Sequence, residues 1–237
     1  MRASTLALVL LLAPSAAVAQ SCPAPLASAT RLVLVTADTV NSPAARVQRF
    51  TRANVNAPWR ADGGPVSALV GRNGMAWGYP FRSLTRPGEP VKVEGDKRAP
   101  IGFYTIGPSF GFAASLHPRY IQIQPDSVCV DDPAHGAYNT ITTRPRIGVR
   151  VRAENMARVP EYRRGLLVDY PSSGPARGGS CVFIHLWLPG RTAGTGGCGA
   201  LQEPALAGVQ DFAQAGAVLA ILPRPALARF KGCLPGL

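Results

Sequence analysis

A buried-strand pattern followed by a glycine-rich turn constrains this chain more than any other feature. From 181 to 188 both alternating sets of residues are largely apolar, and His185 stands among them. Such a run predicts a central strand that is covered on both faces. A short polar loop then leads to Gly196-Gly197-Cys198-Gly199. Because glycines let main-chain amides turn inward, we expect this turn to leave the Cys198 sulfur uncovered.

A cysteine and a histidine placed in this way are typical of a thiol nucleophile with its general base. The thiolate is the attacking species, and a free cysteine is only slightly ionised at neutral pH, so His185 would take the proton from Cys198. The amides of Gly197 and Cys198 would hold the oxyanion of a tetrahedral intermediate, each donor contributing roughly 3 to 4 kcal/mol. Two alternatives stay open: Cys198 is a structural thiol or half of a disulfide beside a core histidine, or the base is His135 on another loop.

The first residues predict an exported protein. Met1 and Arg2 precede an apolar run from 6 to 14, and Ala17-Val18-Ala19 then forms a cleavage site for a secretory signal peptide of residues 1–19. We therefore expect a single catalytic domain over 20–237, periplasmic or secreted, with no stable membrane insertion. The sequence does not define the oligomeric state.

The five cysteines are an odd number for an oxidising compartment. If Cys198 stays reduced, the other four allow three pairings. We favour Cys22 with Cys233, because chain ends often meet at a domain surface, and therefore Cys129 with Cys181.

Charge and motif spacing restrict the partners. The formal net charge is +12 at pH 7, and loss of Arg2 with the signal peptide leaves +11. A basic surface suits an anionic bacterial wall, whereas export argues against nucleic acid as the partner. The histidines and cysteines lack the spacing of a metal site, so we expect no metal and no cofactor.

Hydrophobic periodicity predicts a mostly β domain with a few short helices. We expect strands at 31–36, 66–70, 75–77, 103–106, 120–124, 148–153, 166–170 and 217–222, together with helices at 43–52 and from Pro204 to Gly216. Asn73-Gly74 predicts a hairpin turn between the second and third of these strands. Residues 80–100 are rich in Pro, Gly and charge, which indicates an exposed loop.

The motif resembles a known family. His185 followed by Thr195-Gly196-Gly197-Cys198 is similar to the signature of the YkuD-like L,D-transpeptidases, in which a histidine precedes a Ser/Thr-x-Gly-Cys segment. Residues 95–106 resemble the T-P-x-G-x-F-x-I segment of that family. The flanking segments look like a proteobacterial branch with an H-x-W motif, and together they cover nearly all of the mature chain.

The resemblance implies a β-sandwich with helical additions and gives roles to particular residues. No Asp or Glu occurs from Tyr170 to Gln202, and the family uses a main-chain oxygen to orient its histidine, which points to the carbonyl of Leu186 or of a neighbour in the cleft. The segment 80–100 lies beside the cleft in relatives, so Lys92 and Arg98 become candidates for substrate binding. Trp187, Thr195 and Gly196 are the remaining candidates of this kind.

This chain departs from the family pattern next to the nucleophile. Many relatives have an arginine where Ala200 stands here, and a histidine where Gly196 stands. If the family arginine binds a carboxylate, another cation must replace it, and Arg177 is our candidate.

The function implied by the resemblance is remodelling of peptidoglycan. Cys198 would form a thioester with a stem peptide, and an amine of a second stem would complete a 3-3 cross-link. Two alternatives remain. One is an L,D-carboxypeptidase or another periplasmic acyl hydrolase of the same fold. The other is a non-catalytic wall-binding module, in which a thiol-reactive acylating agent would not label Cys198.

Overall fold

The computed structural model describes residues 22–171 and 178–236. The expected signal peptide and Arg177 lie outside the described residues. The strands are β1 (Arg31–Ala37), β2 (Ala44–Thr51), β3 (Arg60–Leu69), β4 (Met75–Trp77), β5 (Ala99–Gly111), β6 (Ile121–Gln122), β7 (Ser127–Val130), β8 (Ile141–Thr143), β9 (Ala153–Asn155), β10 (Arg164–Val168), β11 (Phe183–Leu186), β12 (Gly199–Leu201) and β13 (Val218–Pro223). The helices are α1 (Ala24–Ser28), η1 (Tyr79–Leu84), α2 (Arg144–Ile147), η2 (Met156–Arg158), η3 (Pro160–Arg163), α3 (Glu203–Ala213), α4 (Arg224–Leu227) and η5 (Ala228–Phe230).

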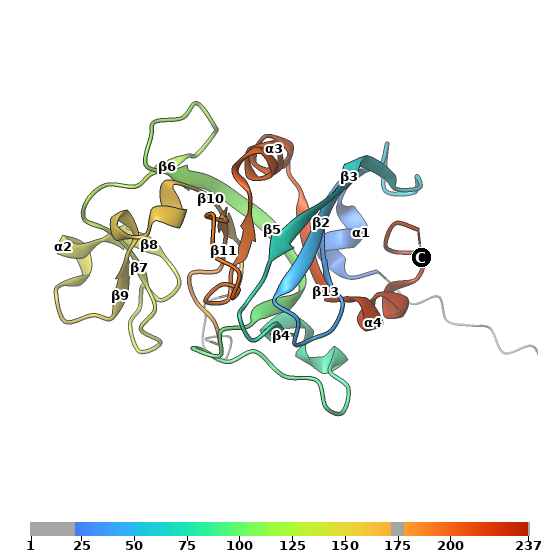
Figure 1. The fold of residues 1–237 in the computed structure, drawn as a ribbon, viewed down its shortest axis with the longest axis horizontal. Helices are drawn as coiled ribbons and strands as arrows, with labels where there is room; N and C mark the ends of the chain where they lie inside the picture. Colours follow the sequence, from blue (N-terminus) through green and yellow to red (C-terminus); the bar gives the residue numbers. More distant parts are fainter. Residues whose placement is uncertain (1–21, 172–177, 237) are drawn as a thin grey trace, which may run out of the picture.

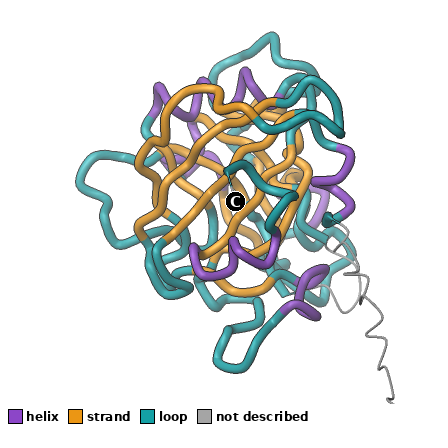
Figure 2. The backbone as a smooth tube through the Cα atoms, turned by 90° about the vertical axis from the view of Figure 1, so that its right-hand side faces the viewer, coloured by secondary structure: helices purple, strands orange, loops and turns teal. Residues whose placement is uncertain are grey.

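One large sheet forms the body of the structure. Its strand order is β10-β11-β12-β3-β2-β1-β13-β5-β4, with β6 beside β5. The long strand β5 pairs with β13 through residues 102–105 and with β10 through residues 106–111, so the sheet curls round and closes on itself. Figure 2 shows strands at the centre of the molecule and loops around them. The prediction of a mostly β fold is confirmed, and the two layers expected of a sandwich belong to one continuous sheet.

Strand β11 divides the interior into two apolar clusters. Val182, Ile184 and Leu186 belong to the main core inside the curled sheet. Phe183 points the opposite way, into a second cluster that also contains Cys198. Alternate residues of a strand face opposite sides, so this segment is covered on both faces, as its sequence pattern predicted. The strand extends over only four residues, and β10 and β12 flank it.

Helix α3 follows β12 and covers the sheet near β10 and β11. Pro204 lies in its first turn, where a missing N–H costs nothing, as the sequence predicted. The buried side chains of Leu206, Val209 and Phe212 recur at helical spacing and pack into the main core. The helix therefore anchors the chain that leaves the Cys198 turn.

A second, three-stranded sheet of β8, β7 and β9 lies at the opposite end of the molecule from α1 and α4 (Figure 1). A disulfide between Cys129 of β7 and Cys181 ties it to the segment before β11, and a second disulfide joins Cys22 to Cys233. Cys198 is the free cysteine. The predicted pairing is confirmed, and two disulfides fit an exported protein.

Four local predictions are wrong. The expected helix at 43–52 is strand β2, because β1 and β3 offer it backbone partners on both sides. Residues 71–74 do form a turn, but the strands beside it do not pair with each other: β3 pairs with β2 and β12, whereas β4 runs parallel to β5. Residues 148–152 form a turn before β9, and the strand expected at 120–124 is reduced to the two residues of β6.

The segment 80–100 is more ordered than its composition indicated. Helix η1 occupies its start, Val91 forms a bridge with Trp77, and β5 begins at Ala99. Among residues 22–171 and 178–236, no helix combines the length and apolar character needed to span a bilayer.

Candidate active site

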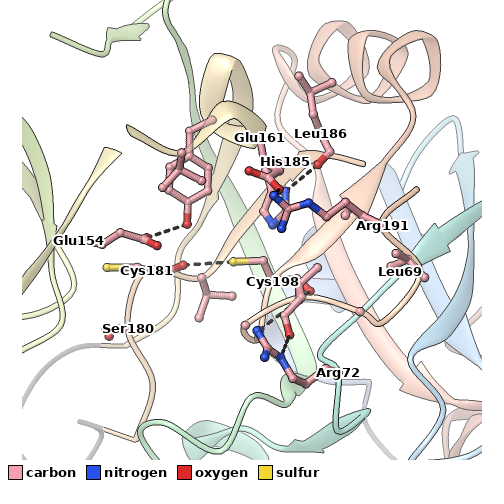
Figure 3. A pocket seen from close by; sticks show the side chains of 18 of the residues that line it. Leu69, Arg72, Glu154, Glu161, Ser180, Cys181, His185, Leu186, Arg191 and Cys198 are labelled. Carbon is pink, nitrogen blue, oxygen red and sulfur yellow. Dashed lines mark hydrogen bonds and ion pairs between the residues drawn. The ribbon is translucent and has the colours of Figure 1, made fainter. Parts of the chain in front are cut away.

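Cys198 and His185 line one pocket of about 380 Å³. Strand β11 carries His185, and the turn before β12 carries Cys198. β11 and β12 are parallel neighbours with His185 opposite Ala200, so Cys198 lies on the adjacent segment, two residues before the partner of His185. Figure 3 shows both side chains directed into the pocket. The structure thus brings together the two residues that the sequence singled out for chemistry.

The Cys198 thiol is buried, which corrects the expectation of an uncovered sulfur. Only 7% of the residue is exposed. Its sulfur lies 3.3 Å from the Cys181 carbonyl oxygen, to which the thiol donates, and 3.4 Å from the main-chain nitrogen of Phe183, from which it accepts. Burial raises the pKa of the thiol to about 12, while the Phe183 N–H acts in the opposite direction. The Cys198 thiol is therefore protonated at rest.

The His185 ring is held by main chain. Its Nδ1 lies 2.9 Å from the carbonyl oxygen of Leu186, and since a carbonyl can only accept, Nδ1 carries the hydrogen. The other ring nitrogen, Nε2, is then free to accept a proton. No carboxylate among the described residues is hydrogen-bonded to the ring. Burial lowers the pKa of His185, and the Leu186 carbonyl and then the Glu161 charge partly oppose this. The imidazole is therefore neutral at rest.

Aromatic packing fixes the plane of this imidazole. The ring of Tyr162, from η3, meets the His185 ring edge to face at a centroid distance of 5.6 Å and the Phe183 ring at 5.4 Å. The Tyr162 hydroxyl donates to Glu154 of β9 over 2.7 Å. Burial raises the pKa of Tyr162 well above its ordinary value, and the nearby Cys198 and Glu154 add to this, so the phenol remains protonated.

The Cys198 turn is closed by a threonine. The Thr195 hydroxyl donates to the Cys198 carbonyl over 2.7 Å and accepts from the Gly197 N–H over 3.1 Å. Gly197 has φ +139°, a conformation that favours glycine. The Gly197 amide is thus occupied within the turn, whereas the Cys198 N–H has no hydrogen-bond partner among the described residues. Of the two oxyanion donors expected from sequence, the Cys198 amide is the one that is free.

Residues 70–72 support the turn from behind. The Thr195 N–H donates to the Val70 carbonyl over 2.8 Å, and the Arg72 N–H donates to the Thr195 carbonyl over 2.9 Å. A Cβ at Gly194, which has φ +84°, would lie 2.7 Å from the Arg72 Cα. The turn predicted at 71–74 therefore buttresses the cysteine loop.

Charges of both signs line the pocket. The cationic residues of the lining are Lys92, Arg72 and Arg191, and the anionic residues are Glu94, Asp131, Glu154 and Glu161. Arg191 pairs with Glu161 over 3.3 Å, and burial raises the pKa of Glu154. Arg72 forms no ion pair within the part of the chain that the structure describes. Its Nε donates to the Thr195 carbonyl over 3.5 Å, and no carboxylate of the described residues neutralises its charge.

The remaining predicted site residues differ in their placement. Trp187, Thr195 and Gly196 line the pocket, although the Thr195 hydroxyl is used within the turn. Lys92 lines it too, but its buried ammonium is held 2.5 Å from Asp96. Arg98 is not brought into the pocket.

Hydrogen bonds and an ion pair elsewhere hold Arg98 and the other two histidines outside the pocket. The Arg98 guanidinium donates to the Asn41 side chain and to the carbonyls of Val40 and Met75, which turn it away from the cavity. His135 and His117 lie outside the pocket lining: His135 accepts from the Ala137 N–H, and His117 pairs with Asp211. Within the described residues, no cluster of His, Cys, Asp or Glu is placed to hold a metal ion.

Sequence reasoning missed several polar or charged residues of the pocket, among them Arg72, Glu154, Glu161, Tyr162 and Arg191. Most come from η3 and β9, far from the motif in the chain, and no local pattern marks them. Arg72 carried a signal, since it lies inside the turn that the sequence predicted.

Comparisons with known proteins give little beyond this geometry. No family model matches the chain, and no curated protein matches it. One solved structure, the helical cell shape determining protein Pgp2 from Campylobacter jejuni, is similar with 17% sequence identity and a TM-score of 0.42. The match covers 82% of this chain and 48% of that chain, so this chain spans about half the length of its neighbour. A similarity at this level does not assign a function.

Proposed function

We propose that this protein is an exported cysteine acyl transferase that acts on peptidoglycan stem peptides, as the resemblance to L,D-transpeptidases implies. One observation carries the proposal: a free cysteine and a histidine with an unprotonated Nε2 line the same pocket, and the histidine is oriented by the Leu186 carbonyl. This is the set of groups that a thioester mechanism requires.

The first step transfers an acyl group to Cys198. The thiol turns from the Cys181 carbonyl toward His185 Nε2, which takes its proton, and the sulfur attacks the carbonyl of a diaminopimelate-type residue. The free Cys198 amide donates to the developing oxyanion. A sulfur–carbon bond forms, the peptide carbon–nitrogen bond breaks, and His185 passes the proton to the departing terminal D-amino acid.

The second step releases the acyl group. The amine of another stem attacks the thioester, a carbon–nitrogen bond forms and the sulfur–carbon bond breaks. His185 removes the amine proton and returns it to the sulfur. With water in place of the amine, the same groups would act as a carboxypeptidase.

Besides Arg177, which lies outside the described residues, Arg72 is a second candidate for the cation that replaces the family arginine. It lines the pocket, and no carboxylate of the described chain pairs with it, whereas Arg191 already pairs with Glu161. A stem peptide carries carboxylates and ammonium groups, so a pocket with charges of both signs suits it. We expect Arg72→Gln to raise KM roughly tenfold with a smaller change in kcat, since it removes one charged hydrogen bond. An equal effect of Arg191→Gln would contradict this assignment.

The test of the function is intact-mass analysis of the mature protein with a disaccharide tetrapeptide, alone and with a second stem as acceptor. We expect an adduct whose mass equals the substrate minus its terminal D-amino acid, and then a cross-linked dimer. Cys198→Ser should form neither, because a serine hydroxyl is far harder to ionise. Release of tripeptide without dimer would indicate a hydrolase, and the absence of any adduct would indicate a binding module.

A further inference from the structure

Cys181 has an unusual backbone conformation just before the histidine strand. Its φ is +52°, in the left-handed region that few residues other than glycine adopt. A cysteine has no side-chain amide or carboxylate to stabilise this conformation locally, as Asn or Asp would have. Something outside residue 181 must therefore hold it.

Two connections hold residue 181 in place. The first is its disulfide to Cys129, a buried residue of β7 in the three-stranded sheet. The second is a hydrogen bond of 2.8 Å from the Cys181 N–H to the side-chain oxygen of Asn139. Asn139 is itself fixed, because its side-chain amide donates to the Tyr170 carbonyl over 2.9 Å. Residue 181 is thus attached to a different sheet on its side-chain side and to a rigid loop on its amide side.

The carbonyl of the same residue faces the nucleophile. Its oxygen is the acceptor of the Cys198 thiol proton, at 3.3 Å from the sulfur. The Phe183 N–H, two residues further along, contacts the sulfur from the strand side at 3.4 Å. Figure 3 shows the Cys181 carbonyl and the Cys198 sulfur joined across the pocket. The conformation of residue 181 therefore decides where the thiol proton points at rest.

We propose that the Cys129–Cys181 disulfide is a positioning device for the nucleophile. It keeps residue 181 left-handed so that the Cys181 carbonyl holds the Cys198 thiol protonated and in one orientation until substrate enters. This role rests on the proposed function, in which Cys198 is the nucleophile. Without the disulfide, an L-residue at 181 relaxes to negative φ, its carbonyl swings away, and the thiol loses its acceptor.

The test uses a probe that does not depend on the physiological substrate. Alkylation of Cys198 by iodoacetamide, followed by intact mass from pH 6 to 10, reports the accessibility and protonation of the thiol even if the protein transfers no acyl group. We compare the wild type with Cys129→Ala/Cys181→Ala and with Cys129→Ala/Cys181→Gly. The matched control is Cys22→Ala/Cys233→Ala, which removes the other disulfide far from the thiol.

Positioning and plain stabilisation predict different results. For Cys129→Ala/Cys181→Ala we expect the rate of Cys198 alkylation to rise roughly tenfold at pH 8 and its pH profile to move to lower pH. The factor follows from the backbone, because the left-handed conformation of an alanine is roughly tenfold less populated than its ordinary conformations. The Cys181→Gly pair should return to within threefold of the wild type, because glycine accepts positive φ. The control pair should stay within twofold. The proposal would be overturned if the alkylation rate of the Cys181→Gly double variant were no closer to the wild type than that of the Cys181→Ala double variant. It would also be overturned if the rate of the control variant changed as much.

A variant that keeps both disulfides covers the case in which the double variants do not fold. Asn139 also has positive φ, at +60°, so Asn139→Gly removes the acceptor of the Cys181 N–H without straining the backbone. We expect at least a threefold rise in alkylation at pH 8, and an unchanged rate would count against the proposal. If the alkylation rates of all these variants match the expected values while no acyl adduct forms with stem peptide, the positioning role stands and the proposed function fails.

Discussion

The reactivity of the resting thiol is the sharpest consequence of this pocket. Burial places the pKa of Cys198 at about 12, compared with 9.0 for an ordinary cysteine thiol. That difference lowers the thiolate fraction roughly a thousandfold at any pH well below 9, which corresponds to about 4 kcal/mol. Burial also lowers the pKa of His185, so the two groups do not form an ion pair at rest. We therefore expect iodoacetamide to react with folded Cys198 at a rate that rises tenfold per pH unit from pH 6 to 10 without a plateau.

The measurement needs an unfolded reference with both disulfides intact. In guanidinium chloride without reductant, Cys198 is the only free cysteine, and its alkylation should level off near pH 9. Steric protection lowers the alkylation rate of the folded protein by the same factor at every pH. The slope of the rate against pH therefore reports the protonation of the thiol, independently of its accessibility. A plateau of the folded protein below pH 8, as in a preformed thiolate–imidazolium pair, would refute the reasoning.

Three further predictions follow from the same contacts. His185→Ala should slow acylation by stem peptide by about 10²- to 10⁴-fold, measured as adduct formation, while the slope of the iodoacetamide profile stays unchanged because His185 is neutral at rest. Thr195→Val should lower the free energy of unfolding by about 2 kcal/mol in urea titrations, since two buried main-chain groups of Gly197 and Cys198 lose their partner; Thr195→Ser is the control and should lose less than half of that. The exported protein should weigh four hydrogens less than its fully reduced form and expose a single thiol to a titrating reagent only after denaturation, so three or five thiols would contradict the two disulfides.

The sequence predicted those parts of the site that are local in the chain. The apolar residues around His185 predicted a strand that is covered on both faces, as the structure has it. The glycines before Cys198 predicted a turn, and Gly197 has a positive φ that favours glycine. The absence of acidic residues from Tyr170 to Gln202 indicated a main-chain partner for the imidazole, and the Leu186 carbonyl is found at Nδ1. Each of these inferences depends on neighbours within a few residues.

The errors arise where distant segments decide the outcome. Ala44, Val47 and Phe50 have helical spacing, yet the buried residues of β2 are Ala45 and Val47, which alternate as a strand does. Hydrogen bonds to β1 and β3 outweigh the weak helical preference. The burial of Cys198 was missed for a related reason: its apolar surroundings include Cys129 of β7, Met156 of η2 and Tyr162 of η3, which are distant from Cys198 in the chain.

A buried, protonated thiol also suits the compartment that the disulfides imply. Thiol–disulfide exchange starts from a thiolate, and Cys129 of the Cys129–Cys181 disulfide shares an apolar cluster with Cys198. A thiol with an ordinary pKa would be oxidised more readily by other disulfides of an oxidising compartment. Holding the proton on Cys198 lowers the thiolate fraction roughly a thousandfold and so slows this oxidation, although by a smaller factor because a thiolate of higher pKa is more nucleophilic. In the proposed function, the thiolate forms only when His185 takes the proton beside a bound acyl group, so the conditions that protect the cysteine would also restrict its reactivity to substrate.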